Sequence, residues 1–215
     1  MLKGKKISIL GDSISTYKDV SNNPSYNIQL YYNPYFYRFP FPVEKTYWQR
    51  LINTFDLSLC VNNSWSGGNL SGIEDEDSGV NRVNHLSNNG GESPDIILVF
   101  MGINDMGRGV KLNVFSADYE SVLETIKNKY PSAKVCCVNL PDRDPVIKKR
   151  TESFNMAIEN ATKKAGENFF VADLFNSKLN NDFYYMNTLD GLHPDEEGMR
   201  YIAETIEDAM RKYIR

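Results

Sequence analysis

Short apolar runs alternate with amphipathic segments along the whole chain. Several of the apolar runs lack a polar residue at every second position, as expected for strands that are covered on both faces. In all, five apolar runs are expected to form strands: Ile7–Leu10, Leu57–Val61, Asp95–Met101, Lys134–Leu140 and Asn168–Leu174. The pattern predicts five buried strands.

Helical spacing of apolar residues predicts the segments between these strands. The expected helices are Tyr47–Phe55, Ala117–Tyr130, Pro145–Ala165 and Pro194–Ile214. Strands that alternate with helices favour right-handed crossovers and a parallel sheet. We therefore expect an α/β protein: a three-layer α/β/α sandwich around a five-stranded parallel sheet, formed by a single domain over residues 1–215, a length that suits one domain.

Composition and charge narrow the possible functions. The chain has 41% hydrophobic and 24% charged residues and a net charge of -4, which argues against a nucleic-acid surface. The N-terminal apolar run of four residues is too short for a signal peptide, and no run approaches membrane-spanning length. Three cysteines, with Cys136 and Cys137 adjacent in an apolar run, are typical of reduced core residues. We expect a cytoplasmic protein without a membrane partner or a metal site.

Polar clusters follow three of the predicted strands, and a fourth cluster precedes the last predicted helix. They are "GDS" at 11–13, "NNSWSGG" at 62–68, "GIND" at 102–105 and "DGLH" at 190–193. Ligands of open parallel sheets bind beyond the carboxyl ends of the strands. The clusters are therefore expected to meet at one edge of the sheet. Gly11 is expected to allow the turn that presents Ser13, and Pro194 to occupy the first position of the last helix.

Together the clusters contain the groups that acyl transfer to a serine requires. Ser13 offers a hydroxyl, His193 a base and Asp190 a carboxylate to orient that base. The backbone N–H groups of Ser13 and Gly67 and the amide of Asn104 can donate to a developing oxyanion. Asp and Ser after a strand are also ordinary turn and cap residues, so the motif at Ser13 alone does not decide between the two roles.

The other candidate residues have simpler interpretations. His85, the second of two histidines, lies in the helix-like "VNRVNHLSNN" and is expected to be a surface or satisfied histidine. Gly67 to Gly72 have P-loop spacing, but Ile73 and Glu74 follow where Lys and Ser or Thr are required. A Gly-x-Ser-x-Gly nucleophile elbow is missing. The acidic run Glu74–Asp77 does not have EF-hand spacing and is expected to be a solvated loop.

In order, "GDSIS", the glycine in "NNSWSGG", "GIND" and "DGLH" resemble the four blocks of the SGNH hydrolases, also called GDSL-type esterases and lipases. The resemblance covers residues 11 to 193. It implies a flavodoxin-like sandwich, Ser13 as nucleophile, His193 and Asp190 as the rest of a catalytic triad, and Gly67 and Asn104 as oxyanion donors. It implies no cofactor. Ile14 replaces the usual Leu of the motif, and Gly68 is an alternative to Gly67.

An aromatic-rich insertion between Lys18 and Lys45 lies outside this pattern. Its rings are Tyr26, Tyr31, Tyr32, Tyr35, Phe36, Tyr37, Phe39 and Phe41. They either pack on the sheet edge or on a partner subunit, or form a wall of the substrate cleft, since aromatic faces stack on sugars and cover acyl chains.

These observations predict a serine esterase that cleaves a small acyl ester, such as an acetylated carbohydrate, through an acyl-enzyme. A small-molecule ester is then its partner, and a homo-oligomer remains open. Two alternatives remain: an acyltransferase with the same triad, and a non-catalytic carbohydrate-binding protein on this scaffold.

Overall fold

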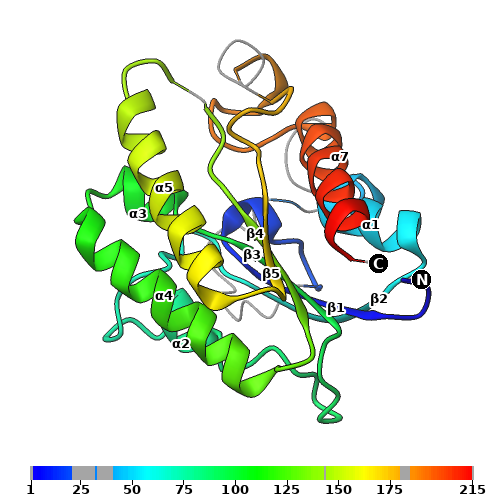
Figure 1. Ribbon diagram of the computed structural model, residues 1–215. Coiled ribbons are helices and arrows are strands. Elements are labelled where there is room, and N and C mark those ends of the chain that lie inside the picture. The colour runs from blue at the N-terminus through cyan, green and yellow to red at the C-terminus, as the bar shows by residue number, and fades with distance from the viewer. Residues whose placement is uncertain (1, 21–31, 33–40, 143, 180–184, 215) are drawn as a thin grey trace.

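Five parallel strands form one sheet in the computed structural model, which describes residues 2–20, 32, 41–142, 144–179 and 185–214 (Figure 1). The strands are β1 (Lys6–Gly11), β2 (Ser58–Ser64), β3 (Ile96–Phe100), β4 (Lys134–Val138) and β5 (Phe169–Ala172). Their order is β2-β1-β3-β4-β5, and each neighbouring pair is parallel. This is the flavodoxin-like order. It confirms the predicted fold class.

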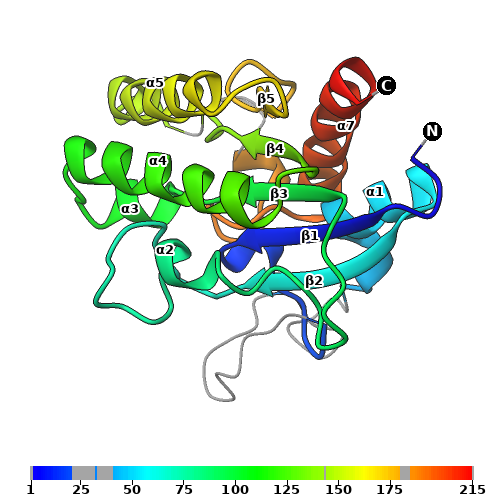
Figure 2. The same cartoon turned by 60° about the horizontal axis from the view of Figure 1, so that its bottom comes forward.

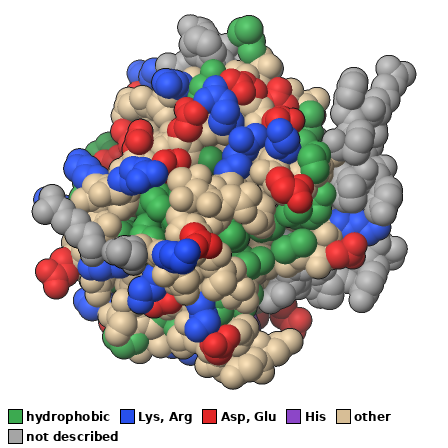
Figure 3. All heavy atoms as spheres, turned by 90° about the vertical axis from the view of Figure 1, so that its right-hand side faces the viewer, with side chains coloured by type: hydrophobic (Ala, Val, Ile, Leu, Met, Phe, Trp, Pro, Cys, Tyr) green, Lys and Arg blue, Asp and Glu red, His purple; other side chains and the backbone are tan. Residues whose placement is uncertain are grey.

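Helices cover both faces of the sheet. Figures 1 and 2 show α4 (Leu112–Lys129) and α5 (Lys148–Ala165) on one face, and α1 (Tyr47–Phe55) and α7 (Glu196–Tyr213) on the other. Two shorter helices, α2 (Gly79–Arg82) and α3 (Ile103–Gly107), follow β2 and β3. One-turn 3-10 helices occupy Ser13–Ser15, Val43–Lys45 and Tyr185–Asn187. The right-hand side of Figure 1, seen in Figure 3, carries interspersed acidic and basic side chains.

The core lies between the sheet and the two helix layers. All five residues of β3 are at most 1% exposed, and Cys136 and Cys137 of β4 are fully buried. Phe115, Tyr119 and other α4 side chains are buried against this core. No helix among the described residues is long and apolar enough to cross a membrane.

Several element boundaries differ from those predicted. Helix α4 begins at Leu112, five residues before the predicted start, because its first turns already bury Phe115. Helices α2 and α3 were not predicted, since elements of four or five residues are too short to show a periodic pattern. The position predicted for Pro194 is wrong. Asp195 caps α7 by accepting the Gly198 N–H at 2.8 Å, so Pro194 precedes the cap.

Gly11 is required for close packing, in contrast to the predicted need for a special turn conformation. It lies within β1 and does not have a positive φ. A Cβ atom there would lie 2.5 Å from the Cβ of Ser15 and 2.8 Å from the hydroxyl of Ser64. The absence of a side chain lets the turn after β1 fold back against the strand ends.

We predict that Gly11→Ala destabilises the protein by about 1–3 kcal/mol, because the added methyl group must displace a packed turn. The matched control is Gly107→Ala in α3, where a Cβ meets nothing within 4 Å. Urea unfolding of both variants measures the effect. Equal stability of the two variants would contradict the packing explanation.

Candidate active site

Ser13 lies at the carboxyl end of β1, on the 3-10 turn Ser13–Ser15. The carboxylate of Asp12 caps this turn by accepting the Ile14 N–H at 3.0 Å. The Thr16 hydroxyl donates to the Ser13 carbonyl at 2.9 Å. Ser13 is 5% exposed. The turn therefore holds the serine in a defined, largely buried position.

Ser13, His193 and Asp190 form a continuous hydrogen-bonded chain. His193 Nε2 lies 2.8 Å from Ser13 Oγ, although the residues are 180 positions apart in the sequence. His193 Nδ1 lies 2.9 Å from Asp190 Oδ2. The other carboxylate oxygen of Asp190 accepts the N–H groups of Leu192 at 3.0 Å and His193 at 2.8 Å. The loop thus orients the carboxylate that orients the imidazole.

Gly67 and Asn104 lie next to each other beyond the ends of β2 and β3. Asn104 Nδ2 donates to the Gly68 carbonyl at 3.0 Å, and the Gly68 N–H donates to the Trp65 carbonyl at 3.0 Å. Among the described residues, the N–H groups of Gly67 and Ser13 donate no hydrogen bond. An asparagine amide carries a second hydrogen. This geometry favours Gly67 over Gly68 as an oxyanion donor.

Gly67 has a φ of +76°, a conformation that other residues rarely adopt. Its neighbour Gly68 lies in the same tight turn after β2. The sequence "SWSGG" therefore encodes a backbone shape that brings this segment next to Asn104.

His85 lies apart from this constellation. It is exposed and follows α2, and its carbonyl accepts a hydrogen bond from Asn63 Nδ2 at 3.1 Å. This placement confirms its interpretation as a surface histidine.

The GDSL-like lipase/acylhydrolase family model matches residues 5–210. The chain belongs to this family. The predicted resemblance is thereby confirmed over almost the full sequence. A comparison with curated proteins found no match.

Solved structures share the fold. A protein from Bacteroides ovatus assigned as a GDSL-like lipase is 25% identical, with a TM-score of 0.77 over 98% of this chain and 99% of that one. The esterase EstA from Pseudoalteromonas sp., inhibited by monoethylphosphonate, is 17% identical, with a TM-score of 0.65 over 98% of each chain. A family 2 carbohydrate esterase with a carbohydrate-binding domain, from Corynascus thermopiles (Myceliophthora fergusii), is 18% identical. The match has a TM-score of 0.67 and covers 100% of this chain and 68% of that one.

Arg82 is a structural residue of the site that the sequence analysis missed. It is 5% exposed, and its guanidinium donates to the carbonyls of Asn63, Asp77 at 2.6 Å and Gly11 at 3.1 Å, and contacts the sulfur of Met101 at 3.4 Å. Burial lowers the pKa of Arg82 to about 10, so it stays charged at neutral pH. Arg82 therefore joins the ends of β1 and β2 and the residue after β3.

Asp105 binds the backbone just after Gly67 and Gly68. Its carboxylate is fully buried and accepts the N–H groups of Leu70 at 2.7 Å and Ser71 at 2.9 Å. Burial raises the pKa of Asp105, and these two N–H groups partly offset the effect. Asn104 and Asp105 together fix the loop that contains Gly67.

The aromatic insertion reaches the residue after His193. Tyr32 is 1% exposed, and its hydroxyl donates to the Pro194 carbonyl at 2.8 Å. Its ring centroid lies 4.9 Å from that of Phe41, and the Tyr17 hydroxyl donates to the Phe41 carbonyl at 2.8 Å. The described part of the insertion therefore packs beside the site. The remaining predicted rings, Tyr26, Tyr31, Tyr35, Phe36, Tyr37 and Phe39, lie outside the described residues.

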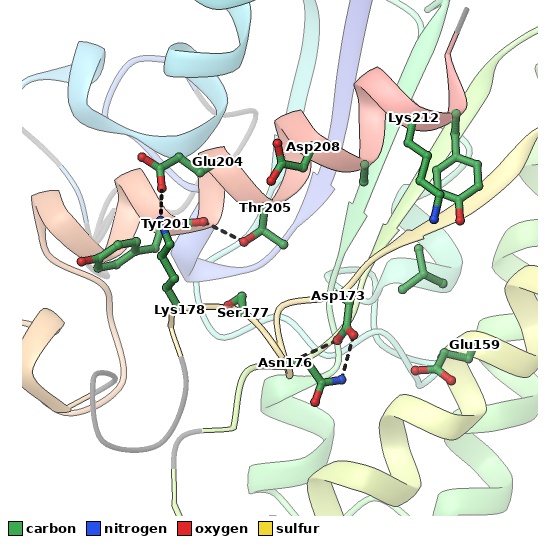
Figure 4. Close-up of a pocket in the computed structure, with 13 residues that line it drawn as sticks. Glu159, Asp173, Asn176, Ser177, Lys178, Tyr201, Glu204, Thr205, Asp208 and Lys212 are labelled. Atoms are coloured by element: carbon green, nitrogen blue, oxygen red, sulfur yellow. Dashed lines mark hydrogen bonds and ion pairs between the residues drawn. The ribbon is translucent and has the colours of Figure 1, made fainter.

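A groove of about 650 Å³ lies between α5, β5 and α7, and none of the predicted site residues lines it (Figure 4). Its walls carry Glu159, Asp173 and Asp208, together with Glu204, which pairs with Lys178 at 3.9 Å. The described residues include no group of three or more His, Cys, Asp or Glu side chains that could hold a metal ion. The hydrogen-bonded chain, and not this groove, therefore identifies the candidate site.

The buried carboxyl of Asp12 makes stability depend on pH. Burial raises the pKa of Asp12 to about 7, and the Ile14 N–H and Arg82 only partly offset it. An unfolded Asp titrates near 3.9. Between about pH 4 and 7 the folded state thus binds more protons, so this group's contribution to stability falls as pH rises through that window.

We predict that Asp12→Asn keeps the cap on Ile14 and removes this titration. The melting temperature of the variant minus that of the wild type should then be more positive at pH 8 than at pH 5. Each kcal/mol of stability should change a melting temperature by about 2–4 °C. Differential scanning calorimetry at both pH values measures the difference. A difference independent of pH would show that the Asp12 carboxyl does not titrate in this range.

Proposed function

We propose that the protein is a serine esterase that cleaves a small acyl ester through an acyl-enzyme intermediate. The observation that carries this proposal is the 2.8 Å contact between Ser13 Oγ and His193 Nε2, backed by Asp190. Membership of the GDSL-like lipase/acylhydrolase family supports hydrolase activity.

In the proposed mechanism, Ser13 Oγ attacks the ester carbonyl while His193 Nε2 takes the hydroxyl proton. The imidazolium that forms is stabilised by Asp190 and then donates its proton to the departing alcohol. Water attacks the resulting acyl-serine with His193 again as base, which releases the acid and restores Ser13. Each proton is thus carried by one imidazole nitrogen.

The negative charge that develops on the carbonyl oxygen needs donors. The N–H groups of Ser13 and Gly67 and the second amide hydrogen of Asn104 supply them in this proposal. Loss of one such donor typically costs about 2.7–4 kcal/mol of transition-state stabilisation. Arg82 and Asp105 act by positioning, because they hold the segment that carries Gly67.

The natural ester in this proposal is an acetylated carbohydrate or a comparable small acyl ester, cleaved in the cytoplasm without a cofactor. The ring of Tyr32 is buried beside the residue after His193, so this ring packs against the protein and does not itself face a substrate. The likeness of the fold to a carbohydrate esterase is consistent with this choice. An acyltransferase would differ only in the acceptor, and analysis of products with added sugars separates the two.

The test is hydrolysis of p-nitrophenyl acetate, butyrate and octanoate by the wild type and by Ser13→Ala. The proposal predicts turnover that falls with chain length and is lost in Ser13→Ala. Ser121→Ala, which removes an exposed hydroxyl from α4, is the matched control and should be fully active. Equal background rates for the wild type and Ser13→Ala would favour the non-catalytic binding protein.

We also predict that Asp190→Asn lowers kcat by about 10⁴-fold, as expected when the imidazole is held in the wrong tautomer. If the amide oxygen keeps the two backbone N–H groups that Asp190 Oδ1 accepts, its NH₂ group faces His193 Nδ1. Nε2 then carries the proton and cannot accept one from Ser13. Steady-state kinetics measure the loss, and an unchanged kcat would exclude Asp190 from the mechanism.

A further inference from the structure

Arg108 places an exposed guanidinium beside the proposed oxyanion segment. It follows Asn104 by one helical turn, and its N–H donates to the Asn104 carbonyl at 2.8 Å. Its Nη2 lies 3.1 Å from the position that a Cβ atom would take at Gly67. Its Nη1 donates to Asn69 Oδ1 at 3.2 Å. The side chain is therefore folded over the turn that carries Gly67.

The charge of Arg108 is not neutralised within the described part of the chain. None of the ion pairs formed there includes Arg108, and its side-chain partner, Asn69, is a neutral amide. The acidic run Glu74–Asp77, which follows the Gly67 turn in the sequence, forms no ion pair with Arg108 either. Most of the guanidinium's five donors thus remain available to a ligand.

Arg82, which lies beside the next residue of the same turn, provides an informative comparison. Its Nη2 lies 3.1 Å from the Cβ position at Gly68, as close as Arg108 is to that of Gly67. However, Arg82 is buried, and its guanidinium donates hydrogen bonds to three backbone carbonyls. Arg82 has a structural explanation, whereas the protein itself gives Arg108 no equivalent set of partners.

We propose that Arg108 binds a carboxylate carried by the substrate close to its scissile ester. The planar fork of a guanidinium matches a carboxylate and binds it with two parallel hydrogen bonds. This inference rests on the proposed esterase function, because it places the ligand's anionic group next to Gly67, a proposed oxyanion donor. It narrows the substrate class to acidic esters.

The carboxylate can belong to the acyl part or to the alcohol part, and two substrate pairs distinguish them. Monoethyl succinate is compared with ethyl butyrate for the acyl part, and acetylated glucuronic acid with acetylated glucose for the alcohol part. For one pair, the wild type should show a kcat/KM about tenfold or more higher for the acidic ester, as expected for a charge-assisted hydrogen bond.

Arg108→Gln should abolish that preference by raising KM for the acidic ester, with the neutral ester unaffected. Arg108→Lys should restore only part of it, because an ammonium lacks the fork. Added salt should reduce the preference, since the contact is exposed. Arg211→Gln is the matched control. It removes an exposed guanidinium, paired with Glu207, from the far end of α7.

Binding to the Ser13→Ala variant separates this inference from the proposed function. Isothermal titration of Ser13→Ala, and of Ser13→Ala combined with Arg108→Gln, uses the same four esters. Tighter binding of an acidic ester that depends on Arg108 supports the inference even if the wild type hydrolyses none of them. Equal affinities for acidic and neutral esters, with and without Arg108, would overturn it.

Discussion

All five strands run parallel, so the segment that follows each strand begins at the same edge of the sheet. The order β2-β1-β3 puts Ser13 between the segments that carry Gly67 and Asn104. His193 lies in the segment that follows β5. Its Nε2 contacts Ser13 Oγ, although the two residues are 180 positions apart in the sequence. One topological constraint thus collects four short polar motifs into one candidate site.

Buried charges stabilise this arrangement by binding backbone. Arg82 donates to carbonyls at two strand ends, and Asp105 accepts two N–H groups from the loop that follows Gly67 and Gly68. Burying an ion is costly unless hydrogen bonds compensate it, and here backbone groups provide that compensation. Two guanidinium groups therefore lie against this turn, the buried one of Arg82 beside Gly68 and the exposed one of Arg108 beside Gly67. A backbone held by several hydrogen bonds suits the oxyanion role that we propose for Gly67.

The sequence predicted the features that depend on pattern. Apolar runs predicted the five strands, and the polar motifs predicted the residues that the structure brings together at the candidate site. The contacts of Arg82 were not predictable from the sequence. Its partners accept through their backbone carbonyls, so they can have any side chain and leave no motif. Helix α3 is too short for a periodic signal. The role of Gly11 was misjudged, since steric contacts with Ser15 and Ser64 arise only in the folded chain.

The central claim is that His193 activates Ser13 as a nucleophile. Intact-protein mass spectrometry after incubation with a fluorophosphonate, followed by peptide mapping, tests it most directly, because phosphonylation requires an activated hydroxyl and not merely a pocket. We expect a single adduct on the peptide that contains Ser13, and almost none in a His193→Ala variant. An unmodified wild-type protein, or an adduct on another residue, would show that His193 does not activate Ser13.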